Sequence, residues 1–173
     1  MEEVYITKER LGLLKRSQKI SANLSRACGC SLTFTEDSVI LNGQPYNEYM
    51  AKNVITAFGR GFDVADALKL LSDDYYFVSI DLEHDAGNEK RLTMIKARII
   101  GENGRTKTYI ESVSRAKISV YGNTVSLIGT IDQINEAETA INTLIDGGTH
   151  KLAYIRMEAA HRKHKNKSIN PFF

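Results

Sequence analysis

The alternation of apolar and polar residues predicts strands in the second half of the chain. Residues 116–122, AKISVYG, alternate Ile118 and Val120 with polar neighbours, and residues 124–129, TVSLIG, alternate again after a Gly-Asn turn. Two short alternating runs joined by such a turn are typical of a β-hairpin. An earlier run rich in aromatic and β-branched residues, Tyr75–His84, predicts a further strand.

Apolar residues spaced three and four apart predict helices around this hairpin. Residues 130–147 carry the spacing after the hairpin, and Gly147 marks the end of that helix. Two short helices are expected before the hairpin, at about residues 91–100, ended by Gly101, and at about residues 105–114. The predicted order of this unit is β-α-α-β-β-α.

The first half of the chain repeats this pattern at an offset of 86 residues. Apolar positions match without a gap over residues 12–61 and 98–147. The matched positions include Leu13-Leu14 with Ile99-Ile100, Leu24 with Ile110, Leu41 with Leu127 and Ile55 with Ile141. We therefore predict an α+β protein with two copies of one unit, each a small antiparallel sheet covered by helices.

The repeat also sets the expected domain boundaries. The first domain spans residues 1–72 and includes a bridging helix within Gly59–Leu71, and the second spans residues 73–150. Residues 151–173 are expected to form a helix and a basic tail that is partly disordered.

Charge distinguishes the two halves more than composition does. The chain has 173 residues and a net charge of only +2, but residues 1–86 sum to −4 and residues 87–173 to +6. The second half therefore has the field to attract a polyanion. The sequence has no apolar run long enough for a membrane span, and its acidic start is unlike a signal peptide. We expect a cytoplasmic protein without a membrane partner.

The candidate chemistry lies in the stretch IIGENGRTK, residues 99–107, between the two short helices. Gly101 and Gly104 allow a tight turn and a close approach of another backbone. The turn leads into a helix N-terminus, which favours anions, and Arg105 and Lys107 add positive charge. The stretch lacks the Gly-Lys-Ser/Thr of a P-loop and the third glycine of a dinucleotide fingerprint. Alone, it is also compatible with a plain helix–helix turn.

Its context resembles a KH domain, in which Ile-Gly-x-x-Gly occurs within a β-α-α-β-β-α unit. The segments RIIGENGRTKTYIE (98–111), ISVYGNTVSLIG (118–129), AINTLIDGGTH (140–150) and AFGRGFDVADALKLL (57–71) together resemble the archaeal tandem-KH RNA-processing proteins. These are related to the eukaryotic partner-of-Nob factors that assemble the small ribosomal subunit. The resemblance covers the chain to about residue 160 and implies two tandem type I KH units.

The resemblance implies single-stranded RNA binding, with a loop that clamps the RNA backbone and an apolar groove that holds the bases. The implied clamp is Gly101, Glu102, Asn103 and Gly104, and the groove is edged by Ile100, Ile118 and Val120. Arg98, Arg105 and Lys107 are expected to meet phosphates. The loop departs from the family at Glu102, where a basic residue is common, so we expect modest affinity.

The resemblance also implies the RNA and the partners. The RNA is pre-ribosomal RNA near the 3′ end of the small-subunit RNA. The implied protein partners are the rRNA-maturation endonuclease and a translation initiation factor subunit. The protein is expected to position RNA and partners, with no cofactor, metal or catalysis.

The first copy and the C-terminal tail are the two other regions with candidate functions. In the first copy the matching loop is Lys15-Arg16-Ser17-Gln18, without glycine, so we expect a degenerate domain that presents a protein-binding face. In the tail, the run HRKHKNK (161–167) is either a solvated segment or a secondary RNA contact through Arg162, Lys163 and Lys165. The terminal Phe172 and Phe173 suggest a docking peptide.

Other candidate chemistry is weaker. Cys28 and Cys30 are too close for an unstrained disulfide and lack further ligands at zinc spacing. The acidic residues around the strand at 75–84 lack the spacing of a calcium loop, and no nucleophile set is recognisable. Two alternatives remain open: a protein scaffold that has lost RNA binding, favoured by Glu102, and a divergent metal-dependent nuclease.

Overall fold

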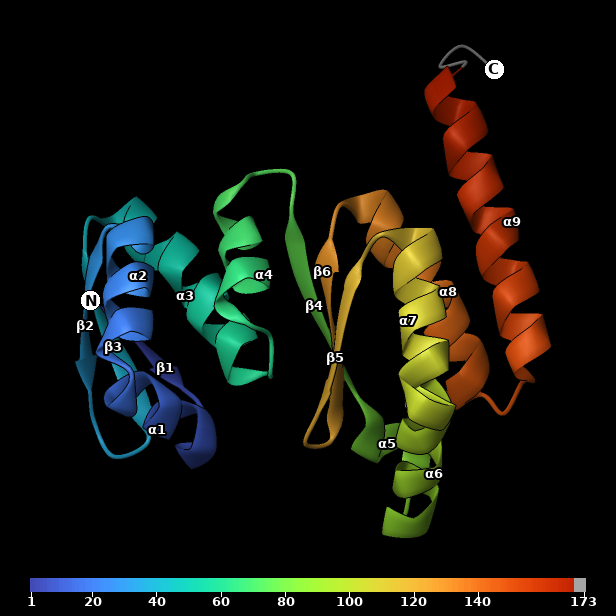
Figure 1. Ribbon diagram of the computed structural model, residues 1–173, viewed down its shortest axis with the longest axis horizontal. Coiled ribbons are helices and arrows are strands. Elements are labelled where there is room, and N and C mark those ends of the chain that lie inside the picture. Colours follow the sequence, from blue (N-terminus) through green and yellow to red (C-terminus); the bar gives the residue numbers. More distant parts are fainter. Residues whose placement is uncertain (170–173) are drawn as a thin grey trace. The chain divides into compact units, whose positions relative to one another are not determined.

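The computed structural model describes residues 1–169 of the chain (Figure 1). It divides into two compact units, Met1–Phe77 and a second that begins at Val78, which we call unit 1 and unit 2. The division falls a few residues beyond the boundary expected at residue 72. The suggested docking peptide with Phe172 and Phe173 lies outside the described residues.

Unit 1 is a three-stranded sheet with helices on one face (Figure 1). Its elements are β1 Glu2–Tyr5, α1 Lys8–Arg16, α2 Gln18–Cys28, β2 Cys30–Phe34, β3 Ser38–Gly43, α3 Pro45–Gly59, α4 Val64–Leu68 and the 3₁₀ turn η1 Lys69–Leu71. The strands pair in the order β1-β3-β2, and β3 is antiparallel to both neighbours. Val39 and Leu41 of the central strand are fully buried, which anchors the sheet to the helices.

Unit 2 has the same strand order, β4-β6-β5. Its elements are β4 Tyr76–Asp81, α5 Leu82–Ala86, α6 Glu89–Ile100, the 3₁₀ turn η2 Glu102–Gly104, α7 Arg105–Ser114, β5 Lys117–Tyr121, β6 Thr124–Gly129, α8 Ile131–Ile145 and α9 His150–Ile169. Its core is one cluster in which Ile99, Ile110, Leu127, Ile141 and Leu144 are fully buried. Thr130 and Gln133 form a capping box that fixes the start of α8.

The strand predicted at 75–84 is shorter than expected. Strand β4 stops at Asp81, whose carboxylate accepts a hydrogen bond from the Glu83 N–H at 2.9 Å and so caps the short helix α5. Gly87 ends α5 in the left-handed conformation. The alternation in the sequence did not signal this helix, because capping rather than periodicity starts it.

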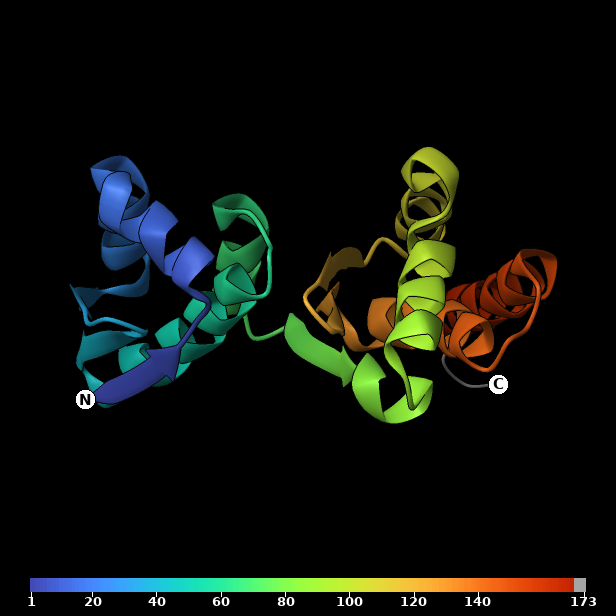
Figure 2. The same ribbon diagram turned by 90° about the horizontal axis from the view of Figure 1, so that it is seen from below.

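Helix α9 forms an outer layer of unit 2, on the side of α7 and α8 away from the sheet (Figure 2). Its own residues Ala153 and Met157 are fully buried and join α9 to the core of unit 2. The basic run at 161–167 belongs to this helix in the structure. Over the described residues, no helix is both long enough and apolar enough to cross a membrane.

The repeat is confirmed at the level of elements. An offset of 86 residues superposes the bounds of β3 on those of β6, and the bounds of α3 on those of α8. The offset is wrong at Leu13-Leu14, because Leu14 is buried and Leu13 is exposed, whereas Ile99 is buried and Ile100 is exposed. The reason is the connection that follows, which is one residue, Ser17, in unit 1 and four residues in unit 2.

Candidate nucleic-acid interface

The apolar pair before the glycine loop is divided between the core and the surface. Helix α6 ends at Ile100, and Gly101 closes it by donating its N–H to the Ala97 carbonyl at 2.8 Å. Ile99 lies in the core, while Ile100 is 37% exposed. One residue of the pair therefore anchors the loop and the other is available to a ligand.

The two loop glycines have different roles. Gly101 has φ +76° and ψ 171°, and a Cβ placed there would lie only 2.7 Å from the Cβ and backbone nitrogen of Thr106. Gly104 has φ +75°, but a Cβ there would meet no described atom within 4 Å. Gly101 is thus required for packing of the loop against α7, whereas Gly104 leaves open space in front of the helix.

The open space at Gly104 lies at the N-terminus of α7. Gly104 is the N-cap residue, and no side chain of the described residues caps this end. Asn103 also has a left-handed backbone, with φ +52°. The 3₁₀ turn η2 supplies one acceptor, since the Arg105 N–H donates to the Glu102 carbonyl. The start of α7 still carries the positive end of the helix dipole, so this end favours an anion.

Charges around the loop are mixed. Arg105 and Glu102 are both exposed, and neither forms an ion pair within residues 1–169. Lys107 is 3.3 Å from the Glu111 carboxylate, which also accepts the Ile118 N–H at 2.8 Å. Arg105 is therefore the loop cation most available to a phosphate, and Glu102 opposes it.

The phosphate contact expected of Arg98 stays a prediction, and in this structure its side chain is bonded within the protein. Its guanidinium donates to the carbonyl of Leu144 at 2.8 Å and to the carbonyl of Gly148. The side chain therefore ties the last turn of α6 to the connection between α8 and α9. The sequence does not show whether a basic side chain one turn before the loop points toward the loop or toward the rest of the protein.

The predicted groove edge is also only partly correct. Ile118 is 3% exposed and belongs to the core of unit 2, so it is not available to a base. Val120 is partly buried and packs against the same core. Exposed apolar contacts come instead from α6, where Met94 and Ala97 precede Ile100 at three-residue spacing. That three-residue spacing is visible in the sequence.

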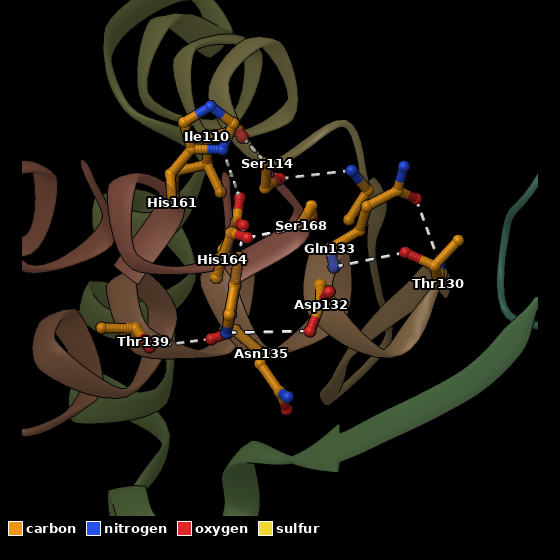
Figure 3. Close-up of polar contacts among 12 residues, drawn as sticks. Ile110, Ser114, Thr130, Asp132, Gln133, Asn135, Thr139, His161, His164 and Ser168 are labelled. Atoms are coloured by element: carbon orange, nitrogen blue, oxygen red, sulfur yellow. Dashed lines mark hydrogen bonds and ion pairs between the residues drawn. The ribbon is translucent and has the colours of Figure 1, made fainter. Parts of the chain in front are cut away.

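The basic run of α9 lies away from the glycine loop. Arg162, Lys163 and Lys165 are all exposed, about 18–23 Å along the helix from His150 at about 1.5 Å per residue. Two histidines hold this half of the helix. The Nδ1 atoms of His161 and His164 each lie 2.9 Å from a carboxylate oxygen of the buried Glu136 on α8 (Figure 3). The structure thus fixes the basic run on a helix but does not bring it to the loop.

The cysteines are buried in unit 1. Cys28 and Cys30 are free thiols, and burial raises the pKa of the Cys28 thiol to about 11. Within the part of the chain that the structure describes, no three His, Cys, Asp or Glu side chains gather as metal ligands.

Comparison with known proteins extends this geometry. A family model described as the eukaryotic type KH-domain (KH-domain type I) matches residues 76–162. The chain is 31% identical over 95% of its length to a KH domain-containing protein of Methanocaldococcus jannaschii, and spans 76% of that protein. The chain belongs to the Pno1 family of KH-domain proteins.

A curated relative and a solved structure are also similar to this chain. The chain is 32% identical over 66% of its length to the pre-rRNA-processing protein pno1 of Emericella nidulans, and spans 46% of that protein. It also matches a solved structure described as the a/eIF2alpha–aDim2p–rRNA complex of Pyrococcus horikoshii. The TM-score is 0.84 and the identity is 32%, with 94% of each chain covered. The matched residues 76–162 lie almost entirely within unit 2 and contain the glycine loop of this Pno1-family chain.

Proposed function

We propose that this chain binds single-stranded RNA through the loop Gly101–Gly104 and acts as an assembly and processing factor for small-subunit rRNA. The observation that carries the proposal is the open, left-handed Gly104 at the uncapped start of α7. The printed descriptions of the relatives, a pre-rRNA-processing protein and an rRNA complex, support the choice of RNA.

The physical basis is close approach of a phosphodiester to the backbone. At Gly104 the space beside the backbone is open, and α7 begins at the next residue, so a phosphate placed there meets the positive end of the helix dipole. Arg105 supplies a cation, and the exposed stripe Met94–Ala97–Ile100 offers an apolar surface to unstacked bases. Glu102 lowers the affinity by repelling phosphate. The role is positioning of RNA, with no bond made or broken by this chain.

A matched pair of variants tests the clamp. Gly104→Asp adds volume and negative charge in the open space, and we expect single-stranded RNA affinity to fall about tenfold or more. Gly87→Asp is the control, because Gly87 has φ +70° and the same open surroundings but lies between α5 and α6. Equal RNA affinity of Gly104→Asp and Gly87→Asp would contradict the proposal.

The basic half of α9 adds a second contact in this proposal. Arg162, Lys163 and Lys165 are exposed and held on a rigid helix, so they offer charge without sequence readout. Replacing all three with glutamine is expected to reduce the slope of log affinity against log salt by about two, since each phosphate contact contributes about 0.7. An unchanged slope would remove α9 from the RNA site.

We further propose that unit 1 is a second, degenerate KH unit. The same order of elements and the same strand order support this, and Ser17 replaces the whole loop. Unit 1 offers a different surface: Tyr46 and Tyr49 are exposed, and Tyr49 lines a cleft of about 180 Å³. We infer that this surface binds protein partners.

The proposed partners are a translation initiation factor α subunit and the rRNA-maturation endonuclease. The first is supported by the description of the Pyrococcus complex, which names a/eIF2alpha beside the aDim2p chain and rRNA. Tyr49→Ala is expected to weaken binding of a purified initiation factor α subunit while leaving RNA affinity unchanged. Intact partner binding together with lost RNA binding in Tyr49→Ala would reverse the assignment of the two units.

The alternative is a protein scaffold without RNA binding, favoured by the exposed carboxylate of Glu102 in the loop. It predicts no measurable RNA affinity for the unmodified chain at about 50 mM salt, where phosphate contacts are strongest. The same titration therefore decides between the two functions.

A further inference from the structure

Residues at the start of α9 contact the two helices that flank the glycine loop. Two side chains in the first two turns of α9, His150 and Tyr154, reach the two ends of the α6–α7 connection. Neither belongs to the loop. Their contacts fix the distance between the last turn of α6 and the first turn of α7.

On the α6 side, the contact is to a helix-terminal carbonyl. The Nε2 of His150 lies 2.9 Å from the carbonyl oxygen of Arg98, three residues before Gly101. A carbonyl only accepts, so Nε2 carries the proton and donates it. The last carbonyls of a helix have no intrahelical donor, and His150 supplies one from α9. The Arg98 guanidinium in turn donates to the carbonyls of Leu144 and Gly148, just before the start of α9.

On the α7 side, the contact is to the residue that packs on Gly101. The hydroxyl of Tyr154 donates to Oγ1 of Thr106 at 3.3 Å, and Thr106 is buried in the first turn of α7. The same Thr106 side chain occupies the space that a Cβ on Gly101 would need. The Tyr154 ring is itself fixed against Tyr109, with ring centroids 4.4 Å apart. A continuous series of contacts therefore runs from α9 to the loop backbone.

We propose that His150 and Tyr154 are positioning residues for RNA binding, and that the first two turns of α9 form a frame that holds the Gly101–Gly104 loop in its binding geometry. The inference rests on the proposed RNA function of that loop. The frame acts through Arg98 and Thr106 and does not touch the RNA. Loosening it widens the range of loop conformations, and RNA then has to order the loop at a cost in affinity.

The direct test is amide hydrogen exchange of residues 101–107 in the full chain without RNA. Tyr154→Phe removes only the hydroxyl and keeps the ring on Tyr109, and Thr106→Val removes the accepting oxygen. We expect both variants to speed exchange at these amides by about threefold or more, and the double variant to add little to either single change. His150→Ala is expected to act in the same direction from the α6 side.

Tyr109→Phe is the matched control. Its hydroxyl also joins α7 to α9, but it donates to Glu158, away from the loop. The control removes one tyrosine hydroxyl between the same two helices, so the loss of a single α7–α9 hydrogen bond is common to both variants. We expect loop exchange in Tyr109→Phe to match that of the unmodified chain. Equal acceleration in Tyr109→Phe and Tyr154→Phe would overturn the frame as a specific device.

RNA titrations separate positioning from contact. We expect Tyr154→Phe and His150→Ala to weaken single-stranded RNA binding about threefold to tenfold with an unchanged salt slope, because no phosphate contact is lost. A flattened slope would overturn the positioning role in favour of direct contact. If the variants exchange faster at residues 101–107 but the unmodified chain binds no RNA, the frame is supported and the proposed function is contradicted. Unchanged exchange with RNA binding intact would overturn the frame alone.

Discussion

The two helix–helix connections at equivalent places in the repeat differ in how they begin the second helix. In unit 1, Ser17 alone joins α1 to α2, and its hydroxyl accepts the Ile20 N–H and caps α2. In unit 2, Gly101–Gly104 joins α6 to α7, and among the described side chains none caps α7. The Ser17 side chain occupies the start of α2, whereas at the start of α7 the Arg105 N–H donates to the Glu102 carbonyl and the space in front of Gly104 stays open.

The serine cap favours helix stability, whereas the glycine loop favours binding of an anion. A serine cap stabilises a helix by about 1 kcal/mol and occupies the space that an anion would need. The glycine loop gives up that stabilisation and places two left-handed residues, Asn103 and Gly104, in front of the helix. In unit 2 the loop packs on Thr106 at Gly101, and Thr106 in turn accepts a hydrogen bond from Tyr154 of α9. The comparison supports the proposal that RNA binds at unit 2, because the two units share an element order but differ at this connection.

The largest effect is expected at Gly101. Gly101→Ala places a Cβ against Thr106 in a backbone region that only glycine adopts readily, so unit 2 should lose about 2–3 kcal/mol of unfolding free energy. Chemical denaturation of the full chain, followed by a probe in unit 2, measures it. Gly104→Ala has open surroundings and should lose only about 1 kcal/mol. Similar losses for the two variants would remove the distinction between the glycines.

The next effect is expected at the cap of unit 1. Ser17→Ala removes the acceptor for the Ile20 N–H and should lower the unfolding free energy of unit 1 by about 1 kcal/mol. RNA affinity should stay unchanged in the same variant. A gain or loss of RNA affinity on this substitution would show that the connection in unit 1 also meets RNA.

Alkaline pH should weaken unit 1 through its buried thiol. Burial raises the pKa of Cys28 from 9.0 to about 11 in the folded chain. Below pH 9 the thiol is protonated in both states and stability is unaffected. Between pH 9 and about 11 only the unfolded chain releases the proton, so the unfolding free energy falls across that window. Cys28→Ala should flatten this part of the pH profile, measured by denaturation, and an equal fall in the variant would contradict the assignment.

The smallest effect is expected at Glu102. Glu102→Gln removes an exposed negative charge beside the phosphate position, so single-stranded RNA affinity should rise about twofold to threefold at low salt and less at high salt. Glu89→Gln, an exposed carboxylate at the far end of α6, is the control. A decrease in affinity for Glu102→Gln would mean that the carboxylate accepts a hydrogen bond from the RNA.

Much of the fold was predictable from local pattern. The hairpin at 117–129 and the closing helix at 131–145 follow periodicity and turn residues, and both occur as expected. The register at Leu13-Leu14 was not predictable, since it depends on a connection whose length is hidden within a continuous apolar match. Helix α5 was missed because the cap at Asp81 outweighs the strand propensity of the residues before it.

The site was predictable only where backbone chemistry defines it. Glycine spacing indicated the loop, because few other residues adopt its backbone conformation. The outward or inward direction of Arg98 and Ile118 depends on tertiary contacts with Leu144, Gly148 and the core of unit 2, which no local pattern encodes. The contacts of His150 and Tyr154 join residues about 50 positions apart and leave no trace in local spacing.

The most direct test of the comparison is an amide NMR titration of the full chain with a short single-stranded RNA. Both connections report in one sample, through the amides of Gly104–Lys107 and those of Ser17–Ile20. We expect the first set to shift in proportion to bound RNA and the second set to remain in place. Shifts confined to Ser17–Ile20, or no shift at Gly104 and Arg105 while RNA is bound, would contradict the assignment of the RNA site to the uncapped glycine loop.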